Sequence, residues 1–209
     1  MLKRTKGRIL LTTLVITGLA GTVKNTTLST QERKFAVTQL KETKTDLLKS
    51  IRGLTTAQLN FRSNPEKWNI KEHLDHLAIA EETLWGVLEI AMKKPATPEK
   101  RYLVKMSDTD VLSAVYVNDK ASYALYTALV EPFNTKWASH SEATNIFKSS
   151  RAKHLKFMKT TTGDLRNRFI HLPMGWIDCY QFVLFMTAYC EGHIRTIHNI
   201  LTDPRFPAH

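Results

Sequence analysis

Two imidazoles, a phenol, a thiol and a carboxylate occur close together near the C-terminus, in the stretch YCEGHIRTIHNIL (189–201). Tyr189 and His193 are four residues apart, so on a helix their side chains share one face. Cys190 is three residues before His193, and as a thiolate it would bind a metal well. His198 lies about 140° around the helix from His193 and cannot easily join them. The stretch is either part of a metal or catalytic site or a packed helix that carries polar residues.

A second pair of histidines lies in the segment KEHLDHLAIAEE (71–82). His73 is three residues before His76, so it could be a further donor to a site at His76. We nevertheless expect His73 and His198 to lie at the surface. Asp75 adjoins His76, but adjacent residues of a helix face different directions. The sequence contains no Gly-x-Ser-x-Gly, phosphate loop, dinucleotide fingerprint or paired-cysteine zinc motif, so the histidine-bearing segments carry the candidate chemistry.

Amphipathic helices must position these side chains. Apolar residues recur with a helical period in several segments, and suitable caps and prolines mark the ends of those segments. Thr30 and Asp178 are candidate N-caps of the first and last helices, and Pro95 and Pro132 stop the second and third. The predicted helices cover roughly 30–53, 69–94, 107–130, 142–159 and 178–201.

The connections are predicted to lack regular structure. Residues 54–68 are expected to form a loop with a turn at Asn64-Pro65, and 93–100 form a polar, proline-bearing break. Residues 169–176 are expected to be irregular because Pro173 and Gly175 oppose a regular element. No segment alternates with the period of a strand. Five helices in a chain of 209 residues indicate one all-α helical bundle.

The first 23 residues differ from the rest of the chain. Four basic residues precede an uncharged apolar run, ILLTTLVITGLAGTV (9–23), in the order of a secretory signal peptide. The run is shorter than the roughly 20 residues that span a bilayer. We therefore expect a signal peptide or, as the alternative, an uncleaved membrane anchor at 1–23, a linker at 24–31 and the helical domain at 32–207. The protein is then periplasmic or extracellular, or stays anchored by that segment.

The formal net charge is +11, and four of the positive charges come before residue 9. The rest of the chain is still basic, most densely in KHLKFMK (153–159). A basic surface suggests acidic partners such as anionic lipid or nucleic acid. We interpret it as a solvated face, and expect no nucleic-acid partner and no membrane contact beyond the N-terminal segment. Cys179 and Cys190 would be about 16 Å apart on one helix, too far for a disulfide.

Motifs in the second and last predicted helices resemble the DinB-like superfamily of bacterial four-helix-bundle proteins. Trp68 opens the second helix, a polar residue follows, and His76 comes eight positions after the tryptophan. The last helix of that family ends in H-x-x-x-H-x-x-Q-I, where His193 matches the second histidine and Ile197 the isoleucine. HLPMGWIDCYQF resembles the family's entry into that helix, and DPRFP its tail. His171 in this segment either faces the mouth of the site or, as we expect, has a structural role in a loop. The similarity extends over roughly 30–207 and implies a DinB-like four-helix bundle with an additional short helix.

The resemblance also implies a metal site. Many members bind a divalent metal through three histidines, one from the second helix and two from the last helix. The matching residues here are His76, Tyr189 and His193, so a phenol replaces one imidazole. Because tyrosine has a pKa near 10, it is a poor zinc ligand at neutral pH, and we expect zinc or nickel to bind weakly or not at all. Alternatively, Tyr189 is a buried tyrosine whose hydroxyl bonds one of the two histidines, and Cys190 is an inert core thiol.

Two functions remain open. In the first, an exported DinB-like bundle with a degenerate metal site binds a small molecule or a partner in the bundle cavity. In the alternative, the protein is a divalent-metal-dependent hydrolase or thiol-type transferase, in which the metal polarises the substrate or lowers the pKa of bound water. The phenol of Tyr189 favours the first. A homodimer is compatible with either, and the sequence identifies neither a substrate nor catalytic residues.

Overall fold

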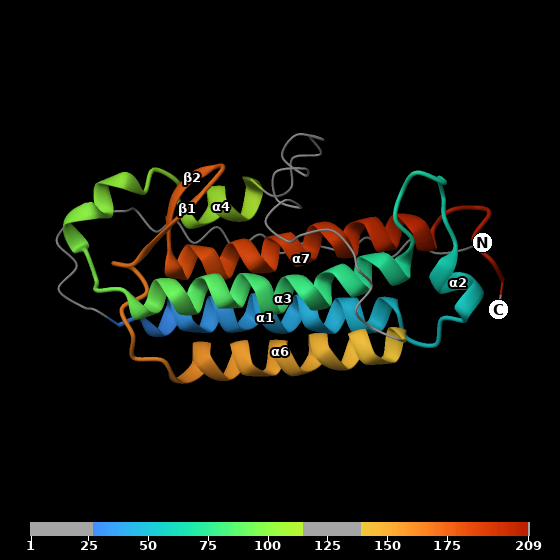
Figure 1. The fold of residues 1–209 in the computed structure, drawn as a ribbon, viewed down its shortest axis with the longest axis horizontal. Coiled ribbons are helices and arrows are strands. Elements are labelled where there is room, and N and C mark those ends of the chain that lie inside the picture. The colour runs from blue at the N-terminus through green and yellow to red at the C-terminus, as the bar shows by residue number, and fades with distance from the viewer. Residues whose placement is uncertain (1–26, 115–138, 209) are drawn as a thin grey trace.

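The computed structural model describes residues 27–114 and 139–208. Its four long helices run side by side along the longest axis of the molecule (Figure 1). α1 and α3 each pack against both α6 and α7, so they occupy opposite corners of the bundle. The four helices are α1 (Thr30–Ser50), α3 (Ile70–Lys93), α6 (His140–Thr160) and α7 (Cys179–Leu201). This mostly helical architecture confirms the predicted all-α bundle.

Capping side chains fix where the long helices begin. Asn69 caps α3 and Asp178 caps α7, each paired with a side chain three residues later in a capping box. Both helices therefore start where the sequence predicts. The cap of α1 is Ser29 rather than Thr30, because the Ser29 hydroxyl accepts the Glu32 N–H. Helix α6 begins after the cap Ser139, slightly earlier than predicted.

Two segments predicted to be irregular contain regular structure. Helix α2 (Thr56–Asn60) lies within the expected loop, because Thr55 and Gln58 form a capping box that starts it. Strands β1 (Phe169–Leu172) and β2 (Gly175–Asp178) pair antiparallel where an irregular stretch was expected. Pro173 lies in the two-residue turn, where it needs no ladder hydrogen bond, and Gly175 has a φ of 117°. The prediction of an irregular 169–176 segment was wrong because Pro173 and Gly175, the supposed breakers, lie in or beside the turn.

The remaining elements are short. The 3₁₀ helix η1 (Pro98–Leu103) occupies the proline-bearing break, and α4 (Asp108–Ala114) begins one residue after the predicted third helix. The rest of that predicted helix lies outside the described residues, as do the signal or anchor segment and part of the linker. Within the described ranges, the helices are all too short or too polar to cross a membrane.

A charge network ties the hairpin end of the bundle together. Nη2 of Arg166 lies 2.7 Å from a carboxylate oxygen of Glu32 and 2.7 Å from one of Asp108. Nη1 of Arg166 lies 3.0 Å from a carboxylate oxygen of Asp178. Arg101 lies 2.7 Å from the same Asp178 oxygen. The network connects α1, α4 and the start of α7. Sequence patterns do not reveal it, since its members are far apart along the chain.

Candidate functional site

Polar and aromatic side chains meet where the first half of α3 crosses the second half of α7. His73 and His76 come from α3, and Tyr189 and His193 from α7. All four are buried. Trp68, in the connection between α2 and α3, is partly exposed and lies against the three imidazoles. We call these five residues the histidine cluster.

The imidazole rings of the histidine cluster are close together. The ring centres of His76 and His193 are 4.9 Å apart, and those of His73 and His193 are 5.2 Å apart. The indole of Trp68 stacks nearly parallel to His193, with ring centres 6.0 Å apart. The convergence of His76, Tyr189 and His193 agrees with the sequence, although their assignment as metal ligands stays a prediction.

Two short hydrogen bonds pair the polar atoms of the cluster. The Nδ1 atoms of His73 and His193 are 2.9 Å apart, and His76 Nε2 lies 2.5 Å from the Tyr189 hydroxyl. A bond between two Nδ1 atoms requires one ring to donate and the other to accept, so the two neutral imidazoles have opposite tautomers. The predicted bond from the Tyr189 hydroxyl to one of the two histidines is confirmed, with His76 as its partner.

Burial keeps these imidazoles neutral. It lowers the pKa of His76 from 6.5 to about 4. Burial and repulsion from a protonated His76 lower the pKa of His73 to about 3. Burial, with repulsion from the other two histidines, holds the pKa of His193 well below its ordinary value. At neutral pH the cluster therefore offers three uncharged rings and a phenol.

The arrangement of donor atoms does not fit a three-ligand metal site. Two nitrogens bound to one tetrahedral ion at about 2.1 Å are about 3.4 Å apart, whereas the two Nδ1 atoms of His73 and His193 are at hydrogen-bond distance. His76 Nε2 is turned to the phenol of Tyr189. Among residues 27–114 and 139–208, no three His, Cys, Asp or Glu side chains are placed to hold an ion.

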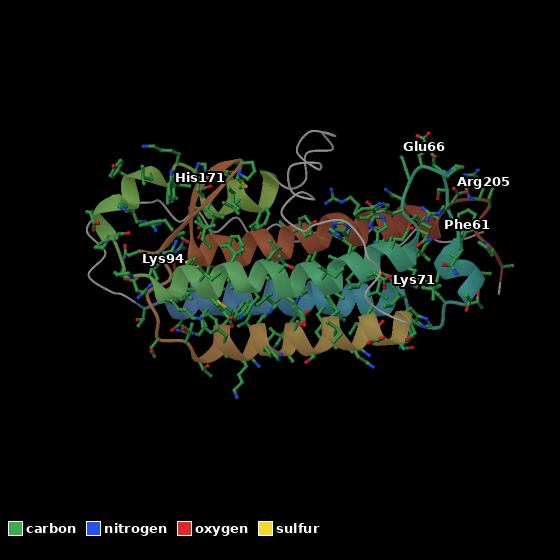
Figure 2. All side chains as sticks on the ribbon, viewed as in Figure 1. Phe61, Glu66, Lys71, Lys94, His171 and Arg205 are labelled. Carbon is green, nitrogen blue, oxygen red and sulfur yellow. The ribbon has the colours of Figure 1, made fainter. Side chains whose placement is uncertain are left out.

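Other candidate residues from the sequence lie elsewhere. His73 was expected at the surface but is buried, because α3 is covered by α7 at this position. Cys190 is a buried free thiol whose pKa burial raises to about 12, in keeping with an inert role. His198 is exposed, as expected, and bonds Ser50. Figure 2 places His171 at the hairpin end, far from Lys71 and the start of α3, so it does not line the histidine cluster.

A second buried polar group was missed by the sequence analysis. Arg151 of α6 lies 2.5 Å from Glu81 of α3, and His154 Nδ1 lies 2.8 Å from the other Glu81 oxygen. The Trp85 indole stacks on His154 with ring centres 3.9 Å apart. A signal was present: Glu81 falls on the apolar stripe of α3, four residues after Leu77 and three before Leu84. A charge on such a stripe predicts a buried partner.

Comparisons with known proteins agree with this fold. The family model of the DinB superfamily matches residues 39–197. A similar solved structure is YfiT from Bacillus subtilis, described as a probable metal-dependent hydrolase with an unusual four-helix bundle topology. The two chains are 14% identical, with a TM-score of 0.57 over 83% of this chain and 87% of that chain. At this identity the likeness concerns the fold alone. A comparison with curated proteins finds no match.

Proposed function

The chain belongs to the DinB superfamily, and from this membership we propose that it is an exported bundle protein that binds a small ligand at the histidine cluster. The metal site of the family is degenerate in this proposal. The observation that carries it is the pairing of the donor atoms: His73 bonds His193, and His76 bonds the phenol at the third family position.

The chemistry of the histidine cluster supports a ligand of small size. Bundle cores place their binding sites between facing helices, and a few converging polar groups with aromatic walls are typical of such sites. The three imidazoles are nearly inaccessible, with at most 3% of each residue exposed. Trp68 is the partly exposed member, so a ligand would enter by displacing the indole from the imidazoles.

A metal-dependent hydrolase or thiol-type transferase is the second candidate. One observation favours it: His73 supplies a third buried, neutral imidazole although position 189 is a phenol. The description of YfiT as a probable metal-dependent hydrolase is in line with this candidate. The rings would have to part from their present hydrogen bonds before three nitrogens could face one ion, so we derive no catalytic step from this geometry.

Calorimetric titration with zinc and with nickel separates the two candidates. We expect protein purified without an affinity tag to bind either metal weakly or not at all. Tyr189→His should tighten binding at least tenfold, because it restores an i, i+4 histidine pair on the face of α7 that meets α3. His198→Gln, which alters an exposed histidine of the same helix, is the matched control. Tight stoichiometric binding by the wild type that is lost in His76→Ala would make the metal enzyme the leading candidate.

The ligand itself can be sought with the same proteins. A ligand-observed NMR screen of small heteroaromatic and carboxylate compounds on metal-stripped protein should give binders that contact the cluster. Their affinity should fall in Tyr189→Phe, since the hydroxyl is lost and the ring is kept, and should be unchanged in His198→Gln. Compounds that bind both variants as they bind the wild type would place the ligand site elsewhere and contradict the proposal.

Export is a separate part of the proposal. Its support is the basic start and uncharged apolar run at 1–23. N-terminal sequencing of protein from its native host should find a mature start at about residues 20–25. An intact Met1 in the membrane fraction would indicate the anchor instead, and an intact Met1 in a cytosolic fraction would contradict both.

A further inference from the structure

Large hydrophobic side chains are exposed at one end of the bundle. The clearest cases are Tyr102 of η1, 68% exposed, and Ile90 of α3, 59% exposed. The members of this set within the described ranges are Phe35, Val87, Ile90, Tyr102 and Trp176. They come from the start of α1, the end of α3, η1 and β2. At the α2 end, by contrast, the described residues expose no comparable side chain.

Hydrogen bonds show that these elements share the hairpin end. Arg33 of α1 donates to the backbone oxygens of Met158 and Thr161 at the end of α6. Arg168 donates to the Lys94 oxygen, which joins the end of α3 to the start of β1. Figure 1 shows the end of α3 and the hairpin at the left of the molecule, opposite α2.

The same end is rich in exposed lysines. Figure 2 shows Lys94 beside the hairpin, whereas Glu66 and Arg205 lie at the opposite end. Within the stretches at this end (30–37, 87–110, 156–161 and 169–178), the exposed carboxylates are fewer than the exposed lysines and are Glu89, Glu99 and Asp110. The exposed lysines of the same stretches are Lys34, Lys93, Lys94, Lys100, Lys105, Lys156 and Lys159. We call these lysines and the five hydrophobic residues the hairpin-end surface.

The apolar run of the sequence joins the bundle at this end. It finishes at residue 23, and α1 begins at Thr30 beside the hairpin-end surface. Six or seven residues span at most about 25 Å when fully extended. If the run stays as an uncleaved anchor, it keeps the hairpin-end surface within that distance of the bilayer.

We propose that the hairpin-end surface docks on an anionic phospholipid bilayer. Tyrosine and tryptophan are enriched at membrane interfaces, where their rings lie at headgroup level. Lysines near an anionic surface each add attraction. A second copy of the chain fits this surface less well, because a symmetric contact would bring the lysines of two copies together. The sequence alone led us to expect no membrane contact by the bundle; the distribution of exposed side chains leads to this proposal.

Vesicle sedimentation with the full chain tests the proposal. The charge variant is Lys156→Glu/Lys159→Glu, at the last turn of α6 on the hairpin-end surface. Its matched control is Lys49→Glu/Arg52→Glu, which makes the same reversal at the end of α1 beside α2. On vesicles of phosphatidylcholine with phosphatidylglycerol, the charge variant should partition at least tenfold more weakly than the wild type, and the control within about twofold of it.

Two further measurements keep the outcomes distinct. Tyr102→Ser/Trp176→Ser should also weaken binding to these vesicles, with an unchanged far-UV circular dichroism spectrum. On pure phosphatidylcholine the charge variant and its control should bind alike. Equal binding of both charge variants to anionic vesicles would mean that the N-terminal run binds alone, and would overturn the proposal. So would a concentration-dependent dimer in ultracentrifugation that Tyr102→Ser/Trp176→Ser abolishes without changing vesicle binding, because the surface would then join two copies.

Discussion

Metal-free protein should lose stability steeply as the pH falls from 6.5 towards 5. In the unfolded chain, His73, His76 and His193 take up protons near their ordinary pKa of 6.5. In the folded chain burial lowers the pKa of His76 to about 4 and that of His73 to about 3, and it holds the pKa of His193 well below 6.5. The unfolded state therefore binds more protons in this range, so the stability is fully present above pH 6.5 and is lost as the pH falls.

The expected slope is large. Each histidine that stays neutral in the folded state lowers the free energy of unfolding by about 1.4 kcal/mol per pH unit below 6.5, so the three together lower it by about 4 kcal/mol per unit. Urea unfolding in the presence of a chelator, followed by circular dichroism from pH 7.5 to 5, measures this slope. His193→Gln should lower the slope by about a third, whereas His198→Gln, at an exposed position, should leave it unchanged. A flat profile in the wild type would mean that the cluster accepts protons while folded.

The starts of the long helices could be predicted because capping residues next to each start determine them. Asn69 and Asp178 are N-cap residue types that directly precede an apolar stripe in the sequence, and both cap their helices in the structure. The hairpin could not be found in this way. Its strands have four residues each, too few for a period of two to stand out, and their pairing depends on a turn at Pro173.

The histidine cluster was only partly predictable for a related reason. Helix α3 lies between two neighbours and buries twelve of its 24 residues, a wider arc than one stripe. His73 and His76 meet α7, whereas Glu81 meets α6. Periodicity identifies a buried face, but it does not show which partner helix each buried polar residue contacts. The bond of His76 to Tyr189 could be predicted, because the family motif places these two positions in the same site.

Removing the carboxylate of Glu81 should destabilise the bundle strongly. Arg151 has no exposed surface, and its Nη2 lies 2.5 Å from Glu81. Its Nη1 lies 3.4 Å from the Thr43 hydroxyl, and its guanidinium lies over the Phe147 ring, 5.3 Å from the ring centre; both partners are uncharged. Glu81→Met would leave this guanidinium buried without a counter-charge, which costs about 3–5 kcal/mol. Chemical denaturation at pH 7.5 measures the loss, and Glu82→Met, at the exposed neighbouring position, should change stability by less than about 0.5 kcal/mol.

The double variant Glu81→Met/Arg151→Met decides what the ion pair contributes. Both charges then leave the core together, and apolar side chains of similar length fill the space between α3 and α6. Buried ion pairs replaced in this way are often neutral or stabilising by about 1–4 kcal/mol, so the double variant should recover most of the stability that Glu81→Met loses. Such recovery would show that the pair adds little net stability, and that each charge is needed mainly to neutralise the other. If the double variant is as unstable as Glu81→Met, the contact of His154 with Glu81 must carry the stabilisation instead, since that contact is absent from both variants.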